Sequence, residues 1–416
     1  MPPGAGRGRV RSQAGWDPIV EPGSALAAEV WASIDEIGRA LQGAERFAGN
    51  SHSLAAGRAG HALFHAYRSL ATGSEDDADA ARDAIDRAID AAGAEPTDGG
   101  LMSGVTGVAW VVRHLGARLV PDAEEIVEPA DALLRELLDL ADRRGAWNGP
   151  FDLMTGLTGV GVYFLEWPDS PERAALVSRV LELLEAAATP VDGGLAWHTP
   201  PDALEETVRS GWPDGYYNLG TAHGAPGVLG FLARVVAAGI ERERASRLLH
   251  DVARWLLARR LPGDPSPGYA TWWWPGRPAT PARTGWCYGN PGVAACLLAA
   301  ADVSGESAWR GAATELAIES ATRPVERTRV SDAGLCHGSA GLVSLFGRLH
   351  RASGDERLRD AGLDWVRRTI ALRQPDCAEH AFLTGAAGIG LALLSAVSSV
   401  SPDWDRVLLG DIPVQS

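Results

Sequence analysis

The stretch Gly104-Val105-Thr106-Gly107-Val108-Ala109-Trp110-Val111-Val112 decides the fold, because its pattern recurs along the whole chain. Two glycines three positions apart open an apolar run, and the same pair occurs seven times. Successive first glycines are separated by between 47 residues (57 to 104) and 68 residues (156 to 224). A motif that returns at such a spacing indicates a repeat architecture. The seven pairs are Gly57/Gly60, Gly104/Gly107, Gly156/Gly159, Gly224/Gly227, Gly289/Gly292, Gly338/Gly341 and Gly385/Gly388.

A second type of segment lies between the glycine motifs. Residues 131–145, for example, alternate apolar and charged side chains with a helical period. Such amphipathic helices cover a surface. The runs after the glycines are instead apolar on most sides, so we expect them to be buried. Similar amphipathic segments lie near residues 26–41, 77–91, 171–187, 241–260, 308–321 and 355–372.

The chain is therefore predicted to be all-α, with fourteen helices in the order outer then inner, seven times. A ring satisfies this pattern without exposed repeat ends: seven inner helices form a barrel, and seven outer helices wrap it antiparallel. We expect this α/α toroid to be one domain over residues 25–416, after a disordered tail, rich in Pro, Gly and Arg, over residues 1–24. Every inner helix would begin on one face of the ring. Its glycines would allow close backbone approach and leave free N–H groups pointing into the central mouth.

Composition excludes several classes of function. The 416 residues carry a formal net charge of −15, and no basic stripe is present, which argues against a nucleic-acid partner. All 38 basic residues are arginine, so Schiff-base and P-loop lysine chemistry is excluded. Four cysteines are too few for a disulfide scaffold. Without a signal peptide or a membrane-spanning run, we expect a soluble cytoplasmic protein.

Two of the segments that lead from an outer to an inner helix are unusually long. They cover about residues 189–221 and 262–286, and both are rich in Pro, Gly and aromatic residues, including Trp272, Trp273 and Trp274. Long loops in a compact domain are usually functional or disordered. The three tryptophans are either a hydrophobic plug over the barrel or one wall of a groove for a peptide.

Soft and titratable side chains gather just before the glycines of three consecutive repeats. Cys287 lies two residues before Gly289, Cys336 and His337 directly precede Gly338, and His223 directly precedes Gly224. Two thiolates and one imidazole suit zinc, and three protein ligands leave a fourth position open for catalysis. On the residues alone, buried free cysteines are an equal alternative. Cys296 is expected in the core, and Cys377, near His380, is either part of a second site or a surface thiol.

Three further polar residues share the glycine face. Asp152 lies four residues before Gly156, Arg283 lies four before Cys287, and Tyr288 follows Cys287. Taken alone, they suit a helix N-cap, a loop salt bridge and a packed ring.

The chain resembles the lanthionine synthetase C family, the cyclases of lanthipeptide biosynthesis. The resemblance covers the chain from about residue 25, since all seven repeats are present. It rests on the segments Phe151-Asp152-Leu153-Met154-Thr155-Gly156, Asn218-Leu219-Gly220-Thr221-Ala222-His223-Gly224, Trp286-Cys287-Tyr288-Gly289-Asn290-Pro291-Gly292 and Cys336-His337-Gly338-Ser339-Ala340-Gly341.

The resemblance implies an α/α toroid with one zinc ion held by Cys287, Cys336 and His337. The family reaction adds a peptide thiol to dehydroalanine or dehydrobutyrine in a dehydrated precursor peptide, which forms a thioether ring. The positions of Asp152, His223, Arg283 and Tyr288 match active-site positions of the family, with His223 in proton transfer. The protein would work beside a separate dehydratase.

The expected roles agree with the chemistry of thiol addition. Negative charge develops on the substrate carbonyl, where Arg283 would stabilise an enolate. His223 would move the proton, and Asp152 would orient a histidine or pair with Arg283. Three rivals remain: a relative that binds or adds glutathione-like thiols without cyclising, a toroidal zinc enzyme such as a protein prenyltransferase β-subunit, and a scaffold with structural zinc.

Overall fold

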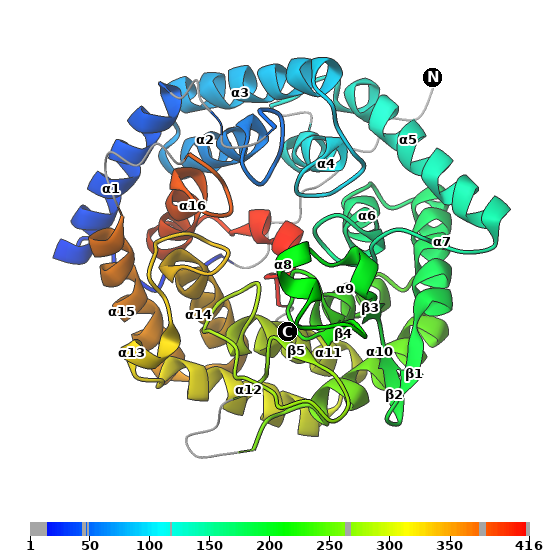
Figure 1. The fold of residues 1–416 in the computed structure, drawn as a ribbon. Coiled ribbons are helices and arrows are strands. Elements are labelled where there is room, and N and C mark those ends of the chain that lie inside the picture. The colour runs from blue at the N-terminus through cyan, green and yellow to red at the C-terminus, as the bar shows by residue number, and fades with distance from the viewer. Residues whose placement is uncertain are drawn as a thin grey trace, which may run out of the picture.

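The computed structural model describes residues 15–43, 47, 50–116, 119–262, 268–373 and 380–412, and these residues form an α/α toroid (Figure 1). Outer helices surround an inner barrel, as the glycine repeat predicts. The outer helices are α1 (Ala25–Gln42), α3 (Glu75–Ala94), α5 (Ala123–Arg144), α7 (Pro171–Ala187), α10 (Arg242–Leu257), α12 (Ser307–Ala321) and α15 (Glu356–Leu372). The inner helices are α2 (Arg58–Thr72), α4 (Val105–Leu115), α6 (Leu157–Leu165), α9 (Ala225–Ala237), α11 (Asn290–Ser304), α14 (Ser339–Ser353) and α16 (Ala386–Val397).

The ring closes through contacts between the two ends of the chain. Each inner helix touches the next one, and α16 touches both α14 and α2. Most inner helices pack on the outer helix that follows them, as α2 does on α3, because the connection between the two is short. The last inner helix, α16, packs instead on α1, the first outer helix. The N-terminal helix thus completes the seventh repeat.

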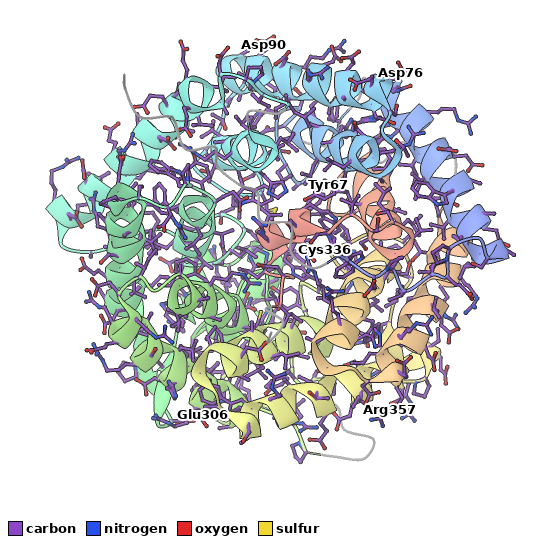
Figure 2. The ribbon with its side chains drawn as sticks, turned by 180° about the vertical axis from the view of Figure 1, so that it is seen from behind. Tyr67, Asp76, Asp90, Glu306, Cys336 and Arg357 are labelled. Carbon is purple, nitrogen blue, oxygen red and sulfur yellow. The ribbon has the colours of Figure 1, made fainter. Side chains whose placement is uncertain are left out.

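Burial separates the two helix types as expected. In α11 every residue from Asn290 to Ala301 is buried, whereas α3 buries only one face. Figure 2 shows charged side chains such as Asp76, Asp90, Glu306 and Arg357 on the outer rim. None of the described helices is both long and apolar enough to cross a membrane.

Close backbone packing explains the second glycine of each pair. A Cβ atom on Gly341 would lie 2.0 Å from the carbonyl oxygen of Leu335, six residues earlier, and one on Gly107 would lie 2.2 Å from that of Leu101. The expected free N–H groups are not present at the starts of α6 and α14. The N–H groups of Ser339, Ala340 and Gly341 donate to carbonyls of residues 332–334 at 3.0–3.3 Å, and residues 157–159 repeat this pattern. The loop folds under its own helix and uses these donors.

The two long loops contain small elements that the repeat pattern did not predict. A hairpin of β1 (Thr189–Val191) and β2 (Gly194–Ala196) is followed by a three-stranded sheet in the order β3-β4-β5. The strands of this sheet are β3 (His198–Thr199), β4 (Tyr216–Asn218) and β5 (Trp272–Trp273). The first long loop also contains the 3-10 helix η2 (Pro201–Ala203) and the short helix α8 (Glu206–Arg209), and α13 (Val325–Thr328) precedes α14. The sheet joins the two loops over one face of the ring (Figure 1).

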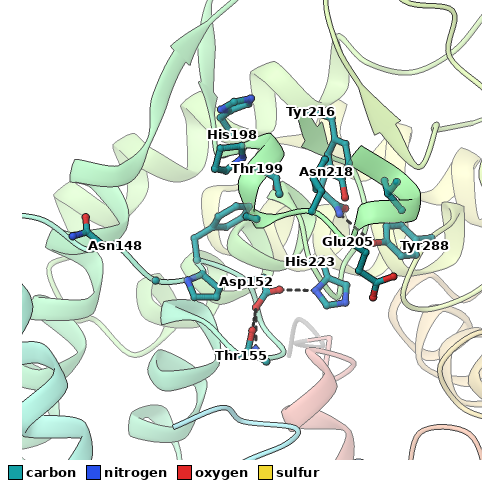
Figure 3. Close-up of a pocket in the computed structure, with 17 residues that line it drawn as sticks. Asn148, Asp152, Thr155, His198, Thr199, Glu205, Tyr216, Asn218, His223 and Tyr288 are labelled. Carbon is teal, nitrogen blue, oxygen red and sulfur yellow. Dashed lines mark hydrogen bonds and ion pairs between the residues drawn. The ribbon is translucent and has the colours of Figure 1, made fainter. Parts of the chain in front are cut away.

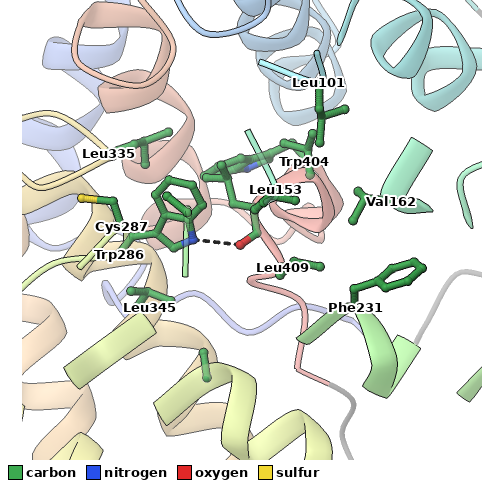
Figure 4. Packing of buried hydrophobic residues seen from close by; sticks show 14 of the residues in the cluster. Leu101, Leu153, Val162, Phe231, Trp286, Cys287, Leu335, Leu345, Trp404 and Leu409 are labelled. Carbon is green, nitrogen blue, oxygen red and sulfur yellow. Dashed lines mark hydrogen bonds between the residues drawn. The ribbon is translucent and has the colours of Figure 1, made fainter. Parts of the chain in front are cut away.

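The segment after α16 fills the end of the barrel opposite the sheet. The 3-10 helix η3 (Asp403–Leu408) lies at the centre of the ring (Figure 1). Trp404 is fully buried, and Asp405 accepts two hydrogen bonds of 2.8 Å from Arg348 of α14. Figure 4 shows Trp286 near Trp404. The Trp286 indole N–H donates to the Leu408 carbonyl at 2.8 Å.

The N-terminal boundary differs from the expected one in its described part. Residues 1–14 lie outside the described residues, but Trp16, Ile19 and Val20 of the expected tail are buried. The Trp16 indole N–H donates to the Ser395 carbonyl of α16 at 2.7 Å. The packed part of the chain therefore begins before residue 25. Burial of the large Trp16 ring stabilises this segment against the barrel.

Candidate active site

A closed ring of backbone hydrogen bonds builds the site. The backbone N–H of the residue two positions before each first glycine donates to the carbonyl of the equivalent residue in the next loop. Seven such hydrogen bonds, of 2.8–3.4 Å, close the ring. In the third repeat the donor is the neighbouring Leu153 instead of Met154. Consecutive loops that lie up to 68 residues apart in the sequence (156 to 224) thus become neighbours in space, and the bond from Leu383 to Ala55 closes the ring. The seven positions are Ala55, Met102, Met154, Ala222, Cys287, Cys336 and Leu383.

Two of these ring positions are the cysteines of adjacent repeats. The Cys287 N–H donates to the Cys336 carbonyl at 3.0 Å, which brings both side chains to one place. The ligand atoms of Cys287, Cys336 and His337 all lie within 4.8 Å of one another. Both thiols are free, and Cys287 is buried. The three predicted ligands therefore converge.

The charges of this cluster suit a cation. A hydrogen bond from Cys336 lowers the pKa of the Cys287 thiol to about 5, even though burial opposes this, and His337 adds to the effect. The same hydrogen bond and burial raise the pKa of Cys336, which the nearby Arg283 guanidinium partly opposes. Two sulfur donors and one imidazole, close together, are a ligand set that fits Zn²⁺.

Asp332, in the loop before α14, lies close to His337 of the cluster. Its Oδ1 accepts from the Gly334 N–H at 2.9 Å, and its Oδ2 lies 3.6 Å from His337 Nε2. Asp98 and Asn218 stand at the same position, six residues before a first glycine, and also accept from the N–H two residues on. Asp332 was not among the predicted site residues, although an Asp or Asn recurs at this position in three repeats.

A second group stands apart from the cysteines. Asp152 Oδ2 lies 2.5 Å from His223 Nδ1, and its Oδ1 accepts from the Thr155 N–H at 2.9 Å. His223 is not part of the three-residue cluster found in the described chain. An ionised carboxylate only accepts hydrogen bonds, so His223 Nδ1 carries the proton. In the neutral ring, Nε2 is then free to accept a proton from a substrate.

Tyr288 connects the two groups. It follows Cys287 in the chain, and its ring lies over that of His223 with centroids 6.3 Å apart. Its oxygen accepts from Asn218 Nδ2 at 3.1 Å, and burial raises the pKa of the phenol, which keeps its proton at neutral pH. The hydroxyl is thus a donor.

Arg283 lies near the cluster without a fixed partner. Its side chain is exposed, and it has no hydrogen bond or ion pair to other described residues. Of the two roles considered for Asp152, pairing with Arg283 is not seen, whereas Asp152 does bond a histidine, His223, and also Thr155.

Asp152, His223 and Tyr288 line a cavity of about 570 Å³ (Figure 3). Its other walls come from the first long loop, including His198, Tyr216 and Asn218, and from residues 148–151 of the loop before α6. None of the three tryptophans is among its lining residues. Trp272 stacks on Tyr216 with centroids 5.1 Å apart, and Trp274 stacks on Tyr217 at 5.9 Å. They support the wall from behind.

The two remaining cysteines are separate from this site. Cys296 is fully buried in α11, as expected for a core residue. Cys377 lies outside the described residues, so the hypothesis of a second site with His380 stays a prediction.

Residues 49–409 match the model of the lanthionine synthetase C-like protein family, and the chain belongs to this family. Among solved structures, the fold is similar to that of nisin cyclase, with a TM-score of 0.76 and 19% sequence identity. The match covers 92% of this chain and 96% of that chain. No curated protein matches the chain in sequence.

Proposed function

We propose that the protein is a zinc-dependent lanthipeptide cyclase, which adds cysteine thiols of a dehydrated precursor peptide to dehydroalanine or dehydrobutyrine. One observation carries the proposal: a Cys-Cys-His cluster lies beside a cavity that holds a histidine–aspartate pair. Cys287, Cys336 and His337 would hold the zinc, whose role is to favour the thiolate form of the substrate cysteine at neutral pH.

The residues around the cavity and the cluster suit the other steps of the reaction. The substrate sulfur forms a bond to the β-carbon, and the π electrons of the double bond move toward the adjacent carbonyl. Tyr288 O–H and the Arg283 guanidinium are the donors that would stabilise this enolate. His223 would take the thiol proton at Nε2 and deliver a proton to the α-carbon, while Asp152 holds its ring. The product is an isomer of the substrate.

The proposal is tested with a dehydrated peptide that contains one cysteine and one dehydroalanine. Since cyclisation leaves the mass unchanged, thiol alkylation is used to count unreacted cysteines. Cys336→Ala should lose zinc and activity together, because a two-ligand site holds zinc poorly. His223→Asn should keep its zinc and slow cyclisation by roughly 10²- to 10⁴-fold. Loss of zinc in His223→Asn would make it a ligand, and full zinc in Cys336→Ala would contradict the ligand set.

The alternative is addition of a free thiol such as glutathione, for which the same cluster is suited. Offering glutathione together with the dehydrated peptide separates the two reactions. Intermolecular addition raises the peptide mass by one glutathione, whereas cyclisation removes the thiol without a change in mass. A mass increase with the peptide cysteine still free would replace the cyclase proposal.

A further inference from the structure

The described walls of the cavity carry unbalanced negative charge. Apart from Tyr216 and Tyr288, the titratable residues of these walls are two carboxylates, Asp152 and Glu205, and two imidazoles, His198 and His223, with no arginine among the lining residues. Asp152 is already bonded to His223. His198 Nε2 is also occupied, since it lies 2.9 Å from the Asp214 carbonyl oxygen. Glu205 is therefore the carboxylate of this cavity that remains to be explained.

Glu205 stands where the first long loop enters α8. Its carbonyl accepts from the N–H groups of Val208 and Arg209, both at 2.9 Å, so the residue is fixed at the helix start. Arg209, the nearest cation in the chain, donates to the carbonyls of Pro201 and Leu204 at 2.9 Å. It also pairs with Glu206 at 3.2 Å, so its guanidinium is engaged by groups other than the Glu205 carboxylate.

The Glu205 side chain shares one cavity with the reacting groups. Glu205, His223 and Tyr288 all line it, as Figure 3 shows. Burial raises the pKa of Tyr216 to about 12, and the charge of Glu205 contributes to this rise, which agrees with their proximity. Glu205 is exposed and has no ion pair with other described residues. A substrate group is thus free to reach it.

Such a carboxylate attracts a cation and repels an anion that binds nearby. We propose that Glu205 is a specificity-determining residue, which selects peptide segments with lysine or arginine beside the reacting residues over segments with aspartate or glutamate there. This inference rests on the proposed function, because it assigns the substrate preference of the same cavity. Glu205 acts by charge and takes no proton in the reaction.

The test uses three dehydrated peptides that differ at one position beside the dehydroalanine, which holds Lys, Gln or Glu. The wild-type kcat/KM should fall by roughly threefold to fivefold at each step, the range of a solvent-accessible charge pair. Glu205→Gln should compress the three values to within about twofold, and Glu205→Arg should reverse their order. The matched control is Glu206→Gln, which removes the same charge one residue away, where the side chain is 87% exposed. It should keep the wild-type order.

A second measurement keeps this inference separate from the proposed function. Fluorescence anisotropy gives the affinities of the three undehydrated peptides for wild type and Glu205→Gln, at low and high salt. The wild-type preference for Lys should weaken with salt. Wild type that cyclises none of the dehydrated peptides contradicts the proposed function, while the affinities still test the charge preference. Equal wild-type affinities, a preference that survives in Glu205→Gln, or an equal slowing of all three peptides in Glu205→Gln would overturn the role of Glu205.

Discussion

Asp152→Asn separates the orientation of His223 from its presence. In the wild type, Thr155 N–H holds one carboxylate oxygen at 2.9 Å, and the other lies 2.5 Å from His223 Nδ1. An asparagine keeps its oxygen at the Thr155 donor, so its NH₂ group faces Nδ1. Two donors cannot share that position, and the ring proton moves to Nε2. His223 then presents the wrong tautomer to the substrate.

The expected loss is that of the general base. General acid–base catalysis contributes about 10²- to 10⁴-fold, which corresponds to about 3–5 kcal/mol in the activation free energy. Zinc content should be unchanged, because Asp152 touches none of the three ligands in the cluster. The assay is the alkylation count of free cysteines over time, at saturating and at limiting peptide. The loss should appear in kcat.

The matched control is Asp98→Asn. Asp98 caps the loop before α4, where its Oδ1 accepts from the Gly100 N–H at 2.7 Å, but it has no histidine partner. This variant should cyclise within about threefold of the wild-type rate, as is usual for a surface change. A wild-type rate in Asp152→Asn, or an equal loss in Asp98→Asn, would refute the tautomer argument.

Three further outcomes are expected. Gly341→Ala should destabilise the fold by about 3 kcal/mol or more, because its Cβ would lie 2.0 Å from the Leu335 carbonyl oxygen, and metal analysis should show less bound zinc. The control is Gly347→Ala, whose Cβ would have its nearest neighbour 4.0 Å away. It should leave the melting temperature unchanged or raise it. Burial lowers the pKa of His61 to about 3, so its stabilising contribution is complete above pH 6.5 and declines as the pH falls toward 3. In this pH range, the difference in unfolding free energy between wild type and His61→Gln should shrink by up to about 1.4 kcal/mol per pH unit. A constant difference would contradict this. Trp272→Ala removes ring contacts with Tyr216 and Trp212. It should lower the free energy of unfolding by about 1–3 kcal/mol and raise KM for the peptide, while zinc is retained. An unchanged KM would favour the alternative that the tryptophans are only a hydrophobic plug.

Much of the fold follows from local pattern. The glycine pairs and the two helix types predict the toroid, because each inner helix needs a start without a side chain and an apolar face all round. Local sequence also encodes one of the small elements in the long loops. Asp192 and Gly193 both have positive φ values, 46° and 78°, as expected for an Asp-Gly turn in the β1–β2 hairpin. Helix α5 begins at Ala123, before the predicted segment 131–145, and contains Pro129, a residue that usually kinks or ends a helix.

The sequence by itself determined the donor types of the site and their place before the glycines, since these depend only on residue identity and period. The tertiary structure decided which of them meet. Cys287 reaches Cys336 because backbone bonds close the ring of loops, and Asp152 reaches His223, 71 positions away in the chain, across the same ring. The wall that carries Glu205 depends on pairing between two long loops. No local pattern encodes such contacts, because they arise only when distant segments share one face of the closed barrel.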